Sequence, residues 1–225
     1  MNVHPFKRLF MTDLRNRRNA IVVSMAAMLL VHTAIMILTD HTQELASLGF
    51  IMVINIVFFA IMLFIPFLHS FSAWREEWKQ HSIYYLLSLP IPRTYLLLSK
   101  YLVILLEALL ITVVMVAGLW IQLGLSNGML FRVEPLLLWD AAKVLLLLKW
   151  LFAASGLIFL NFTSVFLGKW SGKLSLPVAF VSFVAGLFVW IVAFANFPSF
   201  ITLASFTLLF FGASYYLLDK KAEVA

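Results

Sequence analysis

The sequence predicts an all-α protein that crosses a membrane six times, with both termini in the cytoplasm. Hydrophobic residues make up 64% of the 225 residues and charged residues only 12%, whereas a soluble domain carries about 25% charged residues. The apolar residues form long runs, and Lys and Arg gather in alternate connections between them. Lipid is the solvent that such runs favour, so we expect residues 1–225 to form a single transmembrane domain.

Six runs are long enough to span the hydrocarbon core, which takes roughly 20 apolar residues in a helix. Their approximate limits are Ala20–Leu38, Leu48–Phe71, Tyr95–Leu123, Leu136–Leu167, Leu174–Ala195 and Phe200–Leu218. The third run is longer than a bilayer requires, and charges interrupt the fourth.

The orientation follows from Lys and Arg, which favour the cytoplasmic side of a membrane. Of the 16 such residues, 13 lie in the N-terminal segment, the second-to-third and fourth-to-fifth connections, and the C-terminal tail. Only Arg132 lies in the alternate connections. The net charge of +6 is therefore explained by orientation, and we do not expect nucleic-acid binding.

Residues 1–18 precede the first span and are expected to form an amphipathic helix in the cytoplasmic interface. Phe6, Leu9, Phe10 and Leu14 recur at helical spacing, and the basic residues lie largely elsewhere around the helix. The alternative is a charged flank that only orients the first span.

The connection over residues 75–93 contains a short predicted helix, at about Ser82–Leu89. Its apolar side chains are Ile83, Leu86, Leu87 and Leu89. Pro90 and Pro92 end it, because proline lacks the backbone donor that a helix requires. A short amphipathic helix outside the bilayer needs a covering surface, which is a partner protein, the lipid headgroups or its own bundle.

This connection resembles the corresponding loop in the permease subunits of type-two ABC exporters. That loop typically reads Glu, three mostly polar residues, Gly-Thr-Leu-Glu, leucines, Ser-Leu-Pro, and then Arg and Lys. The matching positions here are Glu77, Ser82, Leu86, Leu87, Ser88, Leu89, Pro90, Arg93 and Lys100. Two positions depart from the pattern: His81 stands where Gly is usual, and Tyr84 where the second Glu is usual.

The resemblance implies a membrane-spanning permease subunit of an ATP-driven ABC exporter that is not itself an enzyme. The loop would be a coupling helix that docks on a separate cytoplasmic ABC ATPase. That ATPase would bind ATP and Mg²⁺, so this chain would need no cofactor. A second permease chain, identical or different, would complete the pathway in a bacterial cell membrane. The residues implied in ATPase coupling are Glu77, Ser82, Tyr84, Leu86, Leu87, Pro90 and Arg93. An amphipathic or hydrophobic cargo, such as a peptide, lipid or drug, is compatible with the 22 Phe and seven Trp residues.

Four charged residues lie within or near the spans: Glu107, Asp140, Lys143 and Lys149. A charge near the bilayer centre costs at least about 2.5–3.5 kcal/mol unless it is paired or hydrated. Glu107 and Lys149 lie at similar depths in consecutive antiparallel spans, so an ion pair between them is reasonable. Asp140 and Lys143 are spaced to pair within one helix. Such groups either line a pathway or gate, or fix the register of the helices.

Other chemistry has weak support. Gly168–Lys173 faintly resembles a phosphate-binding loop, but the glycine spacing is one residue short and Leu174 stands where Ser or Thr is required. The chain has no Cys. Its five histidines lack the close spacing of a zinc site and are expected in loops or at the interface, so we predict no metal ligand and no catalytic residue.

Two other functions remain open. A secondary transporter is favoured by Pro66 and Pro177, which could break the second and fifth spans. An intramembrane lipid-processing enzyme would need closely spaced aspartates, whereas Glu76-Glu77 is the only acidic doublet.

Overall fold

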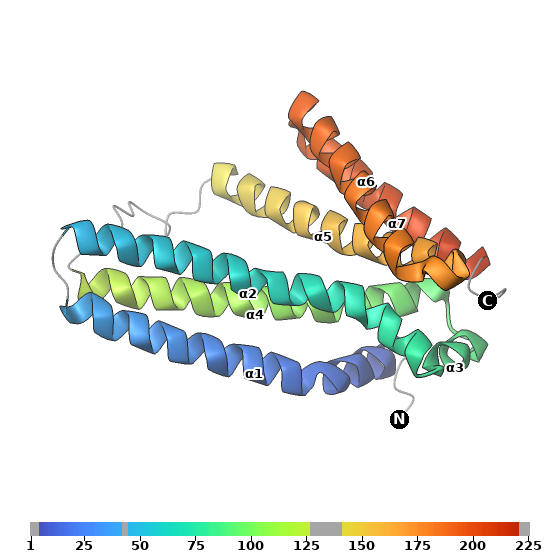
Figure 1. Ribbon diagram of the computed structural model, residues 1–225, viewed down its shortest axis with the longest axis horizontal. Coiled ribbons are helices and arrows are strands. Elements are labelled where there is room, and N and C mark those ends of the chain that lie inside the picture. Colours follow the sequence, from blue (N-terminus) through green and yellow to red (C-terminus); the bar gives the residue numbers. More distant parts are fainter. Residues whose placement is uncertain (1–4, 42–44, 127–140, 221–225) are drawn as a thin grey trace. The chain divides into compact units, whose positions relative to one another are not determined.

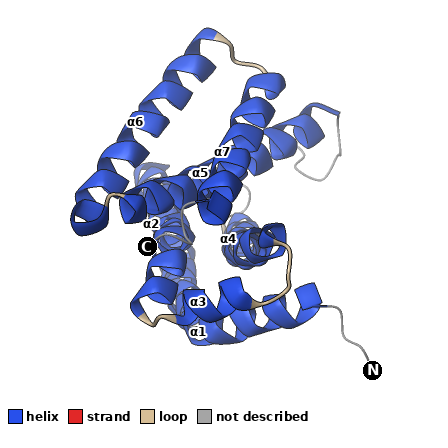
Figure 2. Ribbon diagram, turned by 90° about the vertical axis from the view of Figure 1, so that its right-hand side faces the viewer, coloured by secondary structure: helices blue, strands red, loops and turns tan. Residues whose placement is uncertain are grey.

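A computed structural model describes residues 5–41, 45–126 and 141–220 of the chain. Every element within these ranges is helical (Figures 1 and 2). The α-helices are α1 (Pro5–His41), α2 (Leu45–Lys79), α3 (Ser82–Ser88), α4 (Arg93–Leu125), α5 (Ala141–Trp170), α6 (Ser175–Asn196) and α7 (Phe200–Lys220). A 3-10 turn, η1 (Gly172–Leu174), joins α5 to α6.

Within the described residues, six helices are long and apolar enough to cross a membrane, namely α1, α2, α4, α5, α6 and α7. The predicted helical class and number of spans are confirmed. The three longest helices, α1, α2 and α4, contain 37, 35 and 33 residues. At 1.5 Å per residue they measure about 50–56 Å, against a hydrocarbon core of about 30 Å. Each is therefore much longer than the core is thick.

The N-terminal segment differs from the expected separate helix. α1 runs from Pro5 to His41 with no helix end at Arg18. The interfacial position of residues 1–18 stays a prediction, and residues 1–4 lie outside the described part.

The residues group into two compact units by their internal contacts. Unit 1 comprises residues 1–13, 67–105 and 140–225, and unit 2 comprises residues 14–66 and 106–139. That residues 1–225 form a single transmembrane domain stays a prediction.

Unit 2 consists of segments of α1, α2 and α4 that run side by side (Figure 1). Its larger core cluster contains Met28, Met62, Ile111 and Met115. Methionine suits such a core because its flexible side chain fills irregular gaps between helices.

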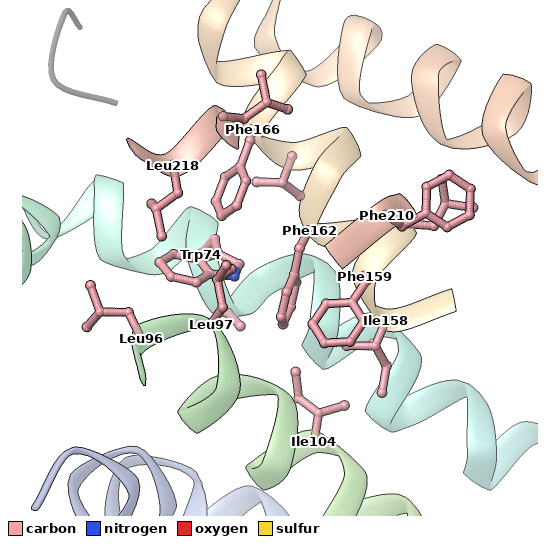
Figure 3. Close-up of a cluster of buried hydrophobic side chains, with 14 of the residues drawn as sticks. Trp74, Leu96, Leu97, Ile104, Ile158, Phe159, Phe162, Phe166, Phe210 and Leu218 are labelled. Carbon is pink, nitrogen blue, oxygen red and sulfur yellow. The ribbon is translucent and has the colours of Figure 1, made fainter. Parts of the chain in front are cut away.

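Unit 1 contains α3, α5, α6 and α7, with the N-terminal end of α1, the C-terminal end of α2 and the N-terminal part of α4. α5 packs against both α6 and α7. The core surrounds Trp74, whose ring lies edge-on at 5.8 Å from Phe162 and 5.0 Å from Phe166 (Figure 3), an arrangement that aromatic rings favour. Ile83 of α3 and Leu218 of α7 belong to the same cluster and are fully buried. Ile83 therefore anchors the short helix α3 in the main core of unit 1.

Gly168 and Gly172, which gave the resemblance to a phosphate-binding loop, have structural roles at the turn between α5 and α6. Gly168 lies in α5, and a Cβ there would collide with the Ser175 carbonyl and the Ala179 side chain. Gly172 has a φ of +69°, a left-handed conformation that glycine adopts without strain. The two glycines thus allow close helix packing and a tight chain reversal.

Neither proline proposed as a helix break divides a span. Pro66 lies inside a continuous α2, and Pro177 lies in the first turn of α6, where proline is tolerated. This removes the observation that favoured a secondary transporter. Three residues join α6 to α7, and the Thr202 backbone N–H donates to the Ser199 hydroxyl at 3.2 Å to cap α7.

Candidate functional site

The predicted helix in the second-to-third connection forms as α3, one residue shorter than expected. His81 precedes it with a φ of 57°, in the left-handed region. This conformation costs a residue with a Cβ roughly 1–2 kcal/mol, which glycine avoids. This segment resembles a loop pattern that usually has Gly at the position of His81. The positive φ found here is a conformation that suits Gly.

A polar contact holds the start of α3. The Ser82 hydroxyl lies within hydrogen-bonding distance of both the Glu77 carboxylate and the Glu77 carbonyl oxygen. Ser82 is the first residue of α3, and Glu77 belongs to the last turns of α2. The pair therefore fixes how α3 leaves α2.

A second contact holds the end of α3. Leu89 is extended before Pro90, which ends the helix. Arg93 Nη1 donates to the Leu87 carbonyl oxygen at 2.6 Å, so it satisfies one of the carbonyls that a helix end leaves unpaired. Arg93 Nε also lies 3.9 Å from Asp219 Oδ1 of α7.

Lys100 of α4 forms the centre of a buried ionic cluster. Its Nζ lies 2.7 Å from Glu77 Oε1 and 3.3 Å from Asp13 Oδ1, and 5.3 Å from the centre of the Trp74 ring. The Ser99 hydroxyl donates to the Asp13 carboxylate. The side chains of Lys100, Asp13 and Glu77 are only 8%, 12% and 16% exposed. Removing one partner of such a buried pair leaves an uncompensated charge, which is strongly destabilising.

Through these contacts α3 is tied to four other helices. Glu77 connects it to α2, Arg93 to α4 and, through Asp219, to α7. Lys100 links Glu77 to Asp13 of α1. A displacement of α3 would therefore reach the adjoining ends of all four.

α3 has two contrasting faces. Ile83 is buried, and Leu86 and Leu87 are partly buried against the core of unit 1. Tyr84 and Tyr85 are 48% and 78% exposed. The exposed side chains are Tyr84, Tyr85 and Ser88 of α3, together with His81, which precedes the helix and whose ring stacks on that of Tyr84. We call these four residues the tyrosine face.

The residues predicted for coupling divide between these two environments. Glu77, Ser82 and Arg93 hold α3 in place, and Leu86 and Leu87 pack it. Tyr84 and Pro90 are exposed and so accessible to a partner. Tyr85 is more exposed than Tyr84 but was not among the predicted residues. Its position two residues after Ile83, away from the apolar side of the helix, would have identified it.

A protein-family model described as "ABC-2 family transporter protein" matches residues 8–218. The chain belongs to the ABC-2 transporter family. The family comprises the membrane permease components of ABC transporters, in which the ATPase is separate. The resemblance noted in the second-to-third connection is thereby confirmed over nearly the whole chain. No curated protein and no solved structure matches it.

The predicted intramembrane charges of this ABC-2 permease fall in different parts of the structure. Glu107 lies in α4 within unit 2 and is fully buried, and Lys149 lies in α5 within unit 1 and is partly buried. Their pairing stays a prediction. Asp140 and the side chain of Lys143 lie outside the described residues, so their local pairing stays a prediction too.

Unit 2 of the permease contains a polar cluster that sequence reasoning missed. His32 was expected in a loop or at the interface, yet it lies within α1 and is 2% exposed. Its Nδ1 is 3.3 Å from Gln122 Nε2, and Asn55 Nδ2 donates to Gln122 Oε1 at 2.7 Å. Gly118 provides the space, because a Cβ there would lie 2.8 Å from the His32 ring. Three polar residues on three helices thus make hydrogen bonds to one another, and His32 Nε2 is buried with no hydrogen-bond partner among the described residues.

Proposed function

We propose that this permease is the membrane-spanning subunit of an ATP-driven exporter and that α3 is its coupling helix. A separate cytoplasmic ABC ATPase docks on α3, binds ATP and Mg²⁺, and supplies the driving force. A second permease chain completes the pathway, in the cytoplasmic membrane of a bacterial cell. The cargo is amphipathic or hydrophobic, of the class of peptides, lipids or drugs.

The observation that carries this proposal is the tyrosine face on a helix that is otherwise fixed in place. Tyr84 and Tyr85 expose large side chains on a seven-residue helix. Tyrosine is enriched among the residues that dominate protein–protein binding energy, because it buries a large area and loses little conformational entropy. A partner protein is therefore the surface that best suits this face.

The other side of α3 suits the transmission of movement. A docking helix moves a bundle only if its own attachment is stiff, since packed and fully paired groups rearrange as units. Ile83 is fully buried, and Glu77 and Lys100 form an ion pair with little exposure. In our proposal, nucleotide-driven movement of the ATPase displaces α3, and the cluster around Lys100 passes that displacement to α1, α2 and α4.

The test is association with the ATPase. An affinity-tagged permease is purified from its own cells in mild detergent, and nucleotide-binding proteins that accompany it are identified by mass spectrometry. Tyr84→Ala and Tyr85→Ala are each expected to reduce the ATPase recovered by about tenfold or more, the loss expected when a central interface tyrosine is truncated. ATP hydrolysis in the purified complex is expected to fall in parallel.

Tyr216→Ala is the matched control, because Tyr216 is 55% exposed but lies on α7. It is expected to leave ATPase recovery unchanged. If no ATPase accompanies the wild-type permease, the proposed docking on α3 is wrong, and proton-driven uptake without ATP would contradict an ATP-driven mechanism.

A further inference from the structure

A surface pocket in unit 1 has no part in the coupling site. It lies between α2, α5 and α6 and has a volume of about 210 Å³. At ~30 Å³ per water molecule this equals about seven waters, enough for a phosphate group. Its lining includes the side chains of Phe71, Arg75, Lys79, Val165, Lys169 and Ala179.

Three of the lining residues are cations, namely Arg75, Lys79 and Lys169. Among the described residues, none of the three forms an ion pair or a side-chain hydrogen bond. Three basic groups around one pocket attract an anion, because each adds to the local positive potential. This contrasts with Lys100, whose charge is already matched by two carboxylates.

The polarity of the lining changes in the same direction along all three helices. On α2, Phe71 lies one turn before Arg75, and Lys79 lies one turn after it. On α5, Val165 lies one turn before Lys169, and on α6, Ala179 lies one turn after Ser175. The lining is therefore basic towards the end of the helices near η1, where it also includes Trp78 and Leu176, and it is apolar further along them.

We propose that this pocket binds an anionic phospholipid, with the phosphate held by Arg75, Lys79 and Lys169. The first acyl carbons lie along Phe71, Val165 and Ala179. A basic pocket between spanning helices at the cytoplasmic surface suits a lipid phosphate, and Lys and Arg predict that this end of α2 and α5 is cytoplasmic. A soluble acidic partner would satisfy the cations but not the apolar end, so the lining favours a lipid. This inference is independent of the proposed coupling role of α3.

The experiment measures lipid retention by the full-length permease. The purified protein is incubated with equimolar phosphatidylglycerol and phosphatidylcholine of identical acyl chains, and bound lipid is counted by native mass spectrometry. We expect phosphatidylglycerol to be retained preferentially. Arg75→Gln is expected to lower the ratio of phosphatidylglycerol to phosphatidylcholine by about fivefold, the effect of one interfacial charge. Arg75→Lys, which keeps the charge, is expected to preserve the ratio.

Lys173→Gln is the matched control, because Lys173 is exposed on η1 and does not line the pocket. If Lys173→Gln lowers the ratio of phosphatidylglycerol to phosphatidylcholine as much as Arg75→Gln does, the proposal is overturned. The preference would then depend only on the net charge of the protein. Glycerol phosphate in tenfold excess is expected not to displace the lipid, and displacement would mean a simple anion site without a role for the apolar lining. If Arg75→Gln instead abolishes ATPase recovery and leaves lipid retention unchanged, the pocket is a protein contact and the lipid proposal is wrong.

Discussion

Lys100→Met tests the ionic cluster that holds α3. Methionine keeps most of the length of the lysine side chain but removes its charge. The Nζ of Lys100 serves two carboxylates at once, at 2.7 Å from Glu77 and 3.3 Å from Asp13. Its loss removes the cation that both acids contact, in a site where neither side chain is more than 16% exposed.

The magnitude follows from this burial. Removing one partner of a buried ion pair costs about 3–5 kcal/mol, whereas exposed pairs contribute about 0–1 kcal/mol. The two carboxylates retain slight exposure, so we expect a loss near the lower limit, about 3 kcal/mol. For a chain of this length that corresponds to a fall of roughly 6–12 °C in the unfolding midpoint.

The assay is the fraction of monodisperse permease that survives heating, measured by size-exclusion chromatography. Lys173→Met, an exposed lysine on η1, makes the same chemical change and is expected to shift the midpoint by less than about 2 °C, as surface substitutions usually do. Adding Glu77→Gln to Lys100→Met neutralises one of the two carboxylates that lose their contact with Lys100 and is expected to recover about half of the loss. A Lys100→Met midpoint equal to that of the control, or a double variant with no recovery, would refute the reasoning.

Two backbone predictions use the same assay. His81→Gly relieves the left-handed strain before α3 and is expected to raise the midpoint by roughly 2–4 °C, because the strain costs about 1 kcal/mol; a lower midpoint would contradict this. Gly118→Ala places a Cβ 2.8 Å from the His32 ring and is expected to cost about 1–3 kcal/mol. Gly212→Ala is its control, since no atom lies within 4 Å of that added Cβ, and equal midpoints for the two variants would show that the His32 ring moves aside freely.

The sequence predicted α3 closely because two local signals coincide there. Apolar residues at helical spacing defined its inner face, and Pro90 set its end, so the predicted Ser82–Leu89 differs from the observed helix by one residue. The six spans were predicted for a similar reason, because each needs only a long apolar run. Local composition and spacing are thus sufficient to place the elements.

Contacts between distant residues could not be predicted in this way. Asp13 lies 86 residues from Ser99 and 87 from Lys100, and no periodicity relates them. His32, Asn55 and Gln122 are likewise isolated polar residues in three separate apolar runs, and only their meeting makes burial favourable. The predicted pair of Glu107 and Lys149 is also a contact between residues far apart in the sequence. Glu107 belongs to unit 2 and Lys149 to unit 1, so the pair stays a prediction.

The division of coupling residues has a practical consequence for mutagenesis. Changes at Glu77, Ser82 or Arg93 are expected to alter the attachment of α3, and so to lower stability together with coupling. Changes at Tyr84 and Tyr85 are expected to weaken partner binding while stability is preserved, because both side chains are exposed. Measuring stability and ATPase recovery on the same variants separates the two effects.

Site-specific cross-linking tests the central claim, that α3 docks on an ATPase, most directly. The chain contains no cysteine, so Tyr85→Cys introduces a unique thiol on the tyrosine face and Lys173→Cys an exposed one on η1. In native membranes treated with a short bifunctional maleimide, we predict that Tyr85→Cys gives a covalent adduct with a nucleotide-binding protein, identified by mass spectrometry, and that Lys173→Cys gives none. An equal adduct from both positions, or none from Tyr85→Cys with the thiol shown to be reactive, would contradict docking on α3.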